Sequence, residues 1–186
     1  ARLSELLPLV FDTKAALDAA PREFDAAAHH ALARRAAEES LVLLKNEGTL
    51  LPLAAGTKVA IIGDFAKNPR YQGAGSSMVN STQVDVLLDK LIESELNMIG
   101  YQQGFDRRGK PDAALQKSAC ELAAQADTVV LCMGLDEIAE SEGLDRSNLR
   151  LAQNQVELLQ AVKAVNPKIV VVLYSGSVVE TPWLDN

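Results

Sequence analysis

Acidic residues gather in one short stretch of the chain, between positions 136 and 145. They are Asp136, Glu137, Glu140, Glu142 and Asp145. A carboxyl group in such a stretch can act as a general acid when an apolar or anionic neighbourhood raises its pKa. The same pattern is also typical of a solvated acidic turn. Spacing alone does not separate these two interpretations.

A second candidate is the polar, glycine-rich stretch at positions 64–82. Its hydrogen-bonding side chains include Arg70, Tyr71, Gln72, Ser76 and Ser77. Glycines between them allow the backbone to approach a ligand or another loop closely. Loops of this length are uncommon in compact domains unless they are functional. We therefore expect a role in substrate binding or domain docking, and the alternative is an ordinary surface loop.

Other chemistries are disfavoured by spacing and by residue counts. Ten positions separate Gly63 from Gly73, so the glycines do not form the tight fingerprint of a dinucleotide site, and no P-loop motif occurs. His29 and His30 are the two histidines of the chain. Adjacent helical positions point about 100° apart, so this pair cannot share a metal, and a histidine-based triad has no suitable base. We expect neither a metal nor a cofactor.

Short apolar runs must position the two polar stretches. Runs at 58–63, 128–133 and 169–174 are typical of strands that are buried on both faces, and 97–101 is a weaker strand. Helical spacing occurs at 27–46, 83–94, 112–126 and 153–165. This alternation predicts an α/β fold, a three-layer α/β/α sandwich with a mainly parallel sheet. Because ligands bind beyond the carboxyl ends of such strands, any site should be built from loops 64–77, 135–145 and 175–179.

Composition limits the class of protein further. The chain has 186 residues, of which 48% are hydrophobic, and its net charge is −7. That charge disfavours nucleic acid and anionic membranes as partners, and no apolar run reaches the ~18–20 residues of a membrane helix. Cys120 and Cys132 stand in apolar surroundings and are expected to be reduced core residues. Trp183 is expected to pack in the core, with a sugar-stacking face as the alternative.

Four ordered segments resemble those of a known family. They are AAEESLVLLKNE at 36–47 with LLPL at 50–53, VAIIG at 59–63 with PRYQGAGSS at 69–77, MGL at 133–135 with ESEGLDRSNL at 140–149 and Gln155, and NP at 166–167 with SGS at 175–177 and Trp183. Together they resemble the C-terminal α/β-sandwich domain of family-3 glycoside hydrolases, the β-glucosidase and β-xylosidase group. The likeness runs from about residue 28 to the end of the sequence.

The resemblance implies a divided active site. A preceding (β/α)₈ barrel would supply the sugar pocket and an aspartate nucleophile, and this domain would supply the general acid/base of a retaining β-glycosidase. The family's acid/base motif matches at Glu142 and Glu140, of which Glu142, next to Gly143, is preferred. Asp145 and Arg146 would fix the loop. The implied partners are the barrel domain of the same protein and a β-linked glucoside, xyloside or oligosaccharide.

The resemblance also predicts how the chain is organised. Residues 1–25 would be a linker or lead-in from the missing barrel, with one short helix, and residues 26–186 a sandwich domain truncated at its C-terminal end. Ala152 stands where family members often have proline. Because the nucleophile is absent, we expect the chain alone to be inactive. Two alternatives stay open: a stand-alone carbohydrate- or nucleotide-binding module, and a purely structural brace. The sequence assigns no compartment.

Overall fold

The computed structural model describes residues 2–21 and 23–184, and its contacts divide the chain into two compact units between Val42 and Leu43. The first unit contains α1 (Arg2–Asp18) and α2 (Ala26–Glu39). The expectation of one short helix in the lead-in is wrong in length, because α1 continues through Pro8 to Asp18. Leucine and alanine are strong helix formers and dominate this segment.

Helix α2 begins where the sequence predicted and ends earlier. Asp25 caps it, since its side chain accepts a hydrogen bond from the backbone N–H of Ala28 at 3.0 Å. The predicted helix 27–46 is wrong beyond Glu39. Ser40 caps the C-terminal end, and its hydroxyl donates to the carbonyl of Ala37 at 2.9 Å. Positions 41–46 form no regular structure before the 3₁₀ turn η1 (Glu47–Thr49).

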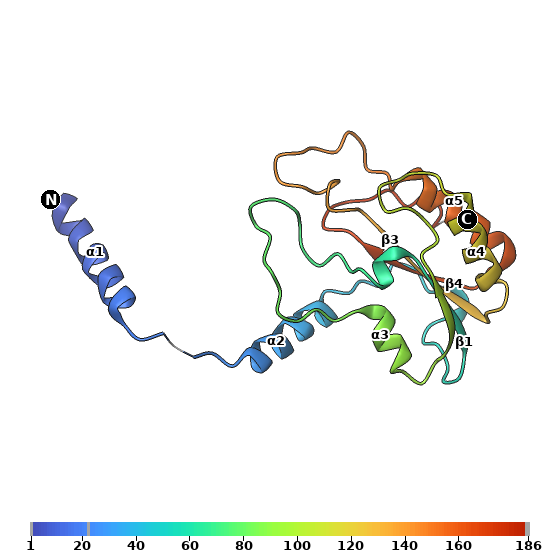
Figure 1. Ribbon diagram of the computed structural model, residues 1–186, viewed down its shortest axis with the longest axis horizontal. Coiled ribbons are helices and arrows are strands. Elements are labelled where there is room, and N and C mark those ends of the chain that lie inside the picture. Colours follow the sequence, from blue (N-terminus) through green and yellow to red (C-terminus); the bar gives the residue numbers. More distant parts are fainter. Residues whose placement is uncertain (1, 22, 185–186) are drawn as a thin grey trace. The chain divides into compact units, whose positions relative to one another are not determined.

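The second unit is built on a four-stranded sheet in which every pairing is parallel. Its strands, in the spatial order β2-β1-β3-β4, are β1 (Lys58–Ile62), β2 (Asn97–Gln102), β3 (Thr128–Gly134) and β4 (Ile169–Tyr174). The flanking helices are α3 (Leu87–Ile92), α4 (Ala113–Ala123) and α5 (Gln153–Val165) (Figure 1). The predicted α/β sandwich is confirmed, with α3 shorter than the predicted 83–94.

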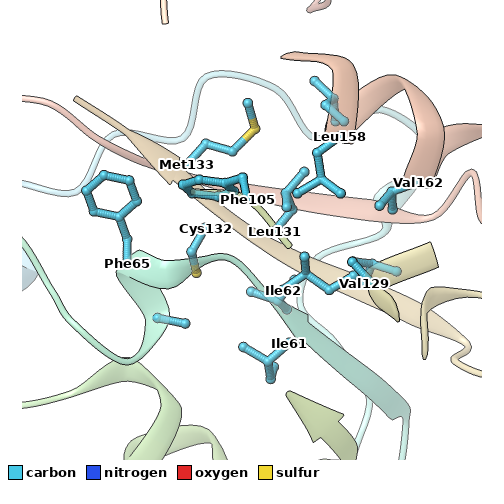
Figure 2. Close-up of a cluster of buried hydrophobic side chains, with 14 of the residues drawn as sticks. Ile61, Ile62, Phe65, Phe105, Val129, Leu131, Cys132, Met133, Leu158 and Val162 are labelled. Carbon is cyan, nitrogen blue, oxygen red and sulfur yellow. The ribbon is translucent and has the colours of Figure 1, made fainter. Parts of the chain in front are cut away.

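The core forms where β1 and β3 pack against the helices. Ile62 lies opposite Leu131 in the parallel register, and Figure 2 shows both side chains among those of Leu158 and Val162 from α5. All four are fully buried. Burying a side chain of this kind contributes about 1.5–3 kcal/mol, so the middle of the sheet provides a rigid base for the loops at its carboxyl edge.

Glycines end the two central strands because no side chain fits there. A Cβ at Gly63 would lie 2.0 Å from the carbonyl oxygen of Cys132, and one at Gly134 would lie 2.2 Å from that of Tyr174. Gln155 then fixes the start of α5 to the end of β3. Its buried amide donates to the carbonyl of Gly134 and accepts from its N–H, each at 2.9 Å.

The expectation that 169–174 is buried on both faces is wrong, because β4 lies at the edge of the sheet and none of its residues is fully buried. Of the two cysteines expected in the core, Cys132 is buried and Cys120 is half-buried. Cys120 and Cys132 are free thiols, and burial raises the pKa of the Cys132 thiol to about 12. Trp183 is half-buried and packs against the core. Among the described helices, none is long and apolar enough to cross a membrane.

Candidate active site

Loops from three strands meet at the carboxyl edge of the sheet. The loop after β1 contains Ala74, which forms an isolated parallel bridge with Ser141 of the loop after β3. The N–H of Glu142 donates to the carbonyl of Ala74 at 3.0 Å. The loop after β4 joins them through Gly176 and Ser177, both of which donate to Glu140. The structure therefore brings the three predicted loops together.

Glu140 is held by donors from the two neighbouring loops. Its Oε2 accepts from Arg70 and from the N–H of Gly176, the latter at 3.0 Å, and its Oε1 accepts from the hydroxyl of Ser177. The side chains of Arg70 and Glu140 are only 8% and 11% exposed. Burial lowers the pKa of Arg70, an effect that the nearby carboxylate of Glu137 opposes. Glu140 and Arg70 thus form a buried ion pair that connects the loops after β1, β3 and β4.

Glu142 is exposed and is held from one side only. Its Oε2 accepts from the hydroxyl of Ser76 and from the backbone N–H of Ser76, the latter at 2.8 Å. Gly75, at φ +110°, allows this approach, since a Cβ there would lie 2.6 Å from Cβ of Glu142. The hydroxyl and then the N–H of Ser76 lower the pKa of Glu142 by bonding to its charged form. In this chain Glu142 is accordingly a carboxylate at neutral pH.

A hollow of about 680 Å³ opens beside these two glutamates. Six of the predicted site residues line it, namely Ser76, Ser77, Glu140, Glu142, Asp145 and Arg146. An adjoining hollow of about 410 Å³ shares Asp145 and Arg146. An open hollow lined by carboxylates and hydroxyls suits a polar ligand such as a sugar.

The other predicted binding residues, Arg70, Tyr71 and Gln72, are not among the residues that line the hollow. Arg70 is occupied by Glu140, and Tyr71 is 54% exposed. The amide of Gln72 closes its own loop, because it accepts from the N–H of Val79 and donates to its carbonyl, each at 3.0 Å. Within the second unit, the hydrogen bonds of Gln72 therefore stabilise the conformation of its own loop. Substrate binding or domain docking by these three residues stays a prediction.

Arg146 connects two loops. Its Nη2 donates to the hydroxyl of Ser177 at 3.1 Å and to the carbonyl of Val178 at 2.6 Å. Asp145 faces the same hollow, and within residues 2–21 and 23–184 it forms no salt bridge to Arg146. Arg146 thus joins the loops after β3 and β4 without the carboxylate next to it.

Sequence reasoning missed Arg107. Its guanidinium donates to Oδ2 of Asp64 at 2.8 Å, to the carbonyl of Asn68 at 2.7 Å and to Glu137, and it lies 4.3 Å from the centre of the Phe65 ring. Arg107 therefore braces the loop after β2 against those after β1 and β3. Its local sequence, Asp-Arg-Arg-Gly, has the appearance of an ordinary solvated turn, so no signal in the sequence singled it out.

The structure also places the residues considered for metal chemistry. His29 and His30 lie on α2, in the first unit, where the ring of His29 stacks on that of Phe24 at 5.2 Å. Across the part of the chain that the structure describes, no three His, Cys, Asp or Glu side chains are grouped to hold a metal ion.

Comparison with known protein families shows which family contains this domain. Residues 41–186 match the glycosyl hydrolase family 3 C-terminal domain. The chain belongs to this family. The match begins close to the boundary between the two units and includes every loop of the site.

Relatives of this family 3 domain are full-length glycosidases. An exo-α-(1→6)-L-arabinopyranosidase of Bifidobacterium breve is 42% identical over 97% of this chain and 25% of its own length, and thermostable β-glucosidase B of Acetivibrio thermocellus is 42% identical over 88% and 22%. A crystal structure of a Bifidobacterium adolescentis family 3 β-glucosidase covers 96% of this chain and 26% of its own, with 44% identity and a TM-score of 0.88. The family 3 domain thus spans about a quarter of these proteins.

Proposed function

We propose that this family 3 domain supplies Glu142 as the general acid/base of a retaining β-glycosidase. The observation that carries the proposal is the contrast between the two glutamates of the motif. Glu142 is exposed at the hollow and uses one oxygen for its contacts with Ser76, whereas both oxygens of Glu140 accept hydrogen bonds from neighbouring loops.

The proposed reaction needs a second carboxylate from outside this chain. In a retaining glycosidase, the two carboxyl groups lie about 5–5.5 Å apart. The nucleophile, an aspartate of a (β/α)₈ barrel by the family resemblance, attacks the anomeric carbon while protonated Glu142 gives its proton to the departing glycosidic oxygen. The Glu142 carboxylate then takes a proton from water as that water attacks the anomeric carbon and releases the nucleophile.

The relatives indicate the substrate class. The relatives named above are a β-glucosidase and an arabinopyranosidase, and a probable β-D-xylosidase of Arabidopsis thaliana is also similar, with 36% identity over 89% of this chain. For this chain we propose a β-linked glucoside, xyloside or oligosaccharide, bound by the barrel and covered by the loops around Glu142. The polar lining formed by Ser76, Ser77 and Arg146 is suited to the leaving-group side of such a substrate.

The test uses the full-length parent enzyme with Glu142→Ala. General-acid catalysis typically contributes ~10²–10⁴-fold, so glycosides with basic leaving groups should slow by about that factor. Activated aryl glycosides should slow much less, because their leaving groups need little protonation. Azide should restore turnover and yield a glycosyl azide, because it can enter the vacated space and attack the glycosyl-enzyme.

The matched control is Glu157→Ala, which removes an exposed glutamate of α5. It should leave the leaving-group series unchanged. If Glu142→Ala behaves like this control, and azide has no effect on it, then Glu142 is not the acid/base and the domain serves as a brace for the barrel.

A further inference from the structure

We propose that Glu140 and Arg70 form a latch that positions Glu142, and that Glu140 itself exchanges no proton with the substrate. This inference rests on the proposed function of Glu142 and assigns the second glutamate of the motif a different role. The argument comes from what each carboxylate touches, from the connections between the loops and from the burial of the ion pair.

Both carboxylate oxygens of Glu140 are already bonded to neighbouring loops. Oε2 accepts from Arg70 and Gly176, and Oε1 accepts from the hydroxyl of Ser177. Protonation of Glu140 would remove the partner of a guanidinium that is itself only 8% exposed. An uncompensated buried charge is strongly unfavourable, so the pairing with Arg70 favours a positioning role for Glu140 over proton donation.

The latch is connected to Glu142 through a single intervening residue. Glu140 precedes Glu142 by two residues, and the residue between them, Ser141, forms the bridge with Ala74. Arg70 anchors the other side of that bridge, since it lies in the same loop as Ala74 and Ser76. The ion pair therefore fixes both loop segments whose relative position decides where the Glu142 carboxylate meets Ser76.

The third loop is shaped to fit this latch. A Cβ at Gly176 would lie 3.2 Å from Nη2 of Arg70 and 3.3 Å from Oε2 of Glu140. A larger residue there would press on both partners of the ion pair. Because position 176 is glycine, its N–H can reach the carboxylate of Glu140. The loop after β4 therefore packs against both Arg70 and Glu140.

The experiment compares Arg70→Met, Glu140→Met and the double variant in the full-length enzyme. Rates are expressed per active site, titrated with a mechanism-based inactivator that carries an activated leaving group. A misplacement of about 1 Å can cost ~10²-fold in rate, so each single variant should lose about that factor in kcat. The loss should be largest for glycosides with basic leaving groups, because these depend most on proton donation by Glu142. Azide should not rescue these variants, because the Glu142 side chain is still present.

The double variant provides the sharpest readout, because it leaves no unpaired buried charge. It should retain more activity and a higher melting temperature than either single variant. If a single variant does not fold, Glu140→Gln, which removes the charge while preserving size and one accepting oxygen, carries the same comparison against the double variant. A merely structural pair would change the melting temperature and leave the rate per titrated site unchanged.

Two results would overturn the latch. Azide rescue of Glu140→Met with formation of a glycosyl azide would make Glu140 the acid/base, and strictly additive losses in the double variant would show that the pair does not act as a unit. Failure of the proposed function has a different signature. In that case Glu142→Ala keeps the wild-type leaving-group dependence, while the non-additivity of Arg70 and Glu140 still decides whether the latch exists.

Discussion

Gly75→Ala should displace the carboxylate of Glu142, the proposed acid/base, without removing that group. The added Cβ would lie 2.6 Å from Cβ of Glu142 and 2.9 Å from its Oε2. Carbon atoms pack at about 3.5–4.0 Å, so one side of the contact has to move by about 1 Å. The atom in contact is Cβ of Glu142, so a change of rotamer cannot relieve the clash and the backbone has to move.

The expected loss of kcat in the full-length parent is about 10²-fold, the typical cost of a 1 Å misplacement. It should be largest for glycosides with basic leaving groups, because these depend most on proton donation. Backbone strain adds a separate effect. An alanine at φ +110° is unfavourable by about 1–3 kcal/mol, which should appear as a lower melting temperature.

Gly143→Ala separates displacement from strain. Gly143 follows Glu142 directly and has φ +80°, yet a Cβ there would meet nothing within 4 Å. This control should lower the melting temperature comparably and lose far less activity. The assay is kcat per titrated active site over a leaving-group series. Equal losses in the two variants would refute the reasoning, because loop strain alone would then explain the effect.

Three further outcomes are expected. In the full-length enzyme Ser76→Ala removes the hydroxyl that lowers the pKa of Glu142, so this pKa should rise and the protonated acid should persist to higher pH. The alkaline limb of the kcat/KM profile should therefore move to higher pH, whereas Ser77→Ala should leave it in place. The isolated chain should show no turnover of aryl β-glucosides at high protein concentration beside an active full-length control, and turnover that follows the purified protein would contradict the divided site. Gln155→Leu leaves the N–H and the carbonyl of Gly134 buried without their partner, so the free energy of unfolding, measured by urea denaturation of the chain, should fall by about 2–4 kcal/mol. The control Gln160→Leu, at an exposed position, should change it by less than ~0.5 kcal/mol.

The strands and the edge that carries the site could be predicted because their signals are local. The apolar, β-branched run Ile169–Tyr174 specifies a strand by itself, although not its edge position, and helix Gln153–Val165 was predicted with the bounds observed. Parallel topology then gathers the loops at one edge without any knowledge of side chains. The C-terminal end of helix α2 was predicted too late, because apolar positions continue beyond Ser40 and hydrophobic periodicity does not detect the capping residue that ends the helix.

The contacts inside the site could not be predicted, because they join residues far apart in the sequence. Arg70 and Glu140 are separated by 70 positions, and Arg107 reaches Asp64 across 43. Each of these arginines stands beside polar residues, so its local sequence is typical of a solvated loop. Only the folded arrangement shows that Arg70 is buried against Glu140, and this in turn is what distinguishes the two glutamates of the motif.

If Glu142 is the acid/base, as proposed, the contact that lowers its pKa gives a reason for the nucleophile to lie nearby on a second domain. Ser76 holds Glu142 as a carboxylate, which is the form required to activate water and the wrong form for protonating a leaving group. A nucleophilic carboxylate about 5–5.5 Å away would oppose this effect, because two like charges raise each other's pKa, and exclusion of water by the substrate would act in the same direction. Once the nucleophile is consumed in the glycosyl-enzyme its charge disappears, and Ser76 again favours the carboxylate that the second step needs. On this proposal the contact with Ser76 and the charge of the absent nucleophile act in turn, so that Glu142 is an acid in the first step and a base in the second.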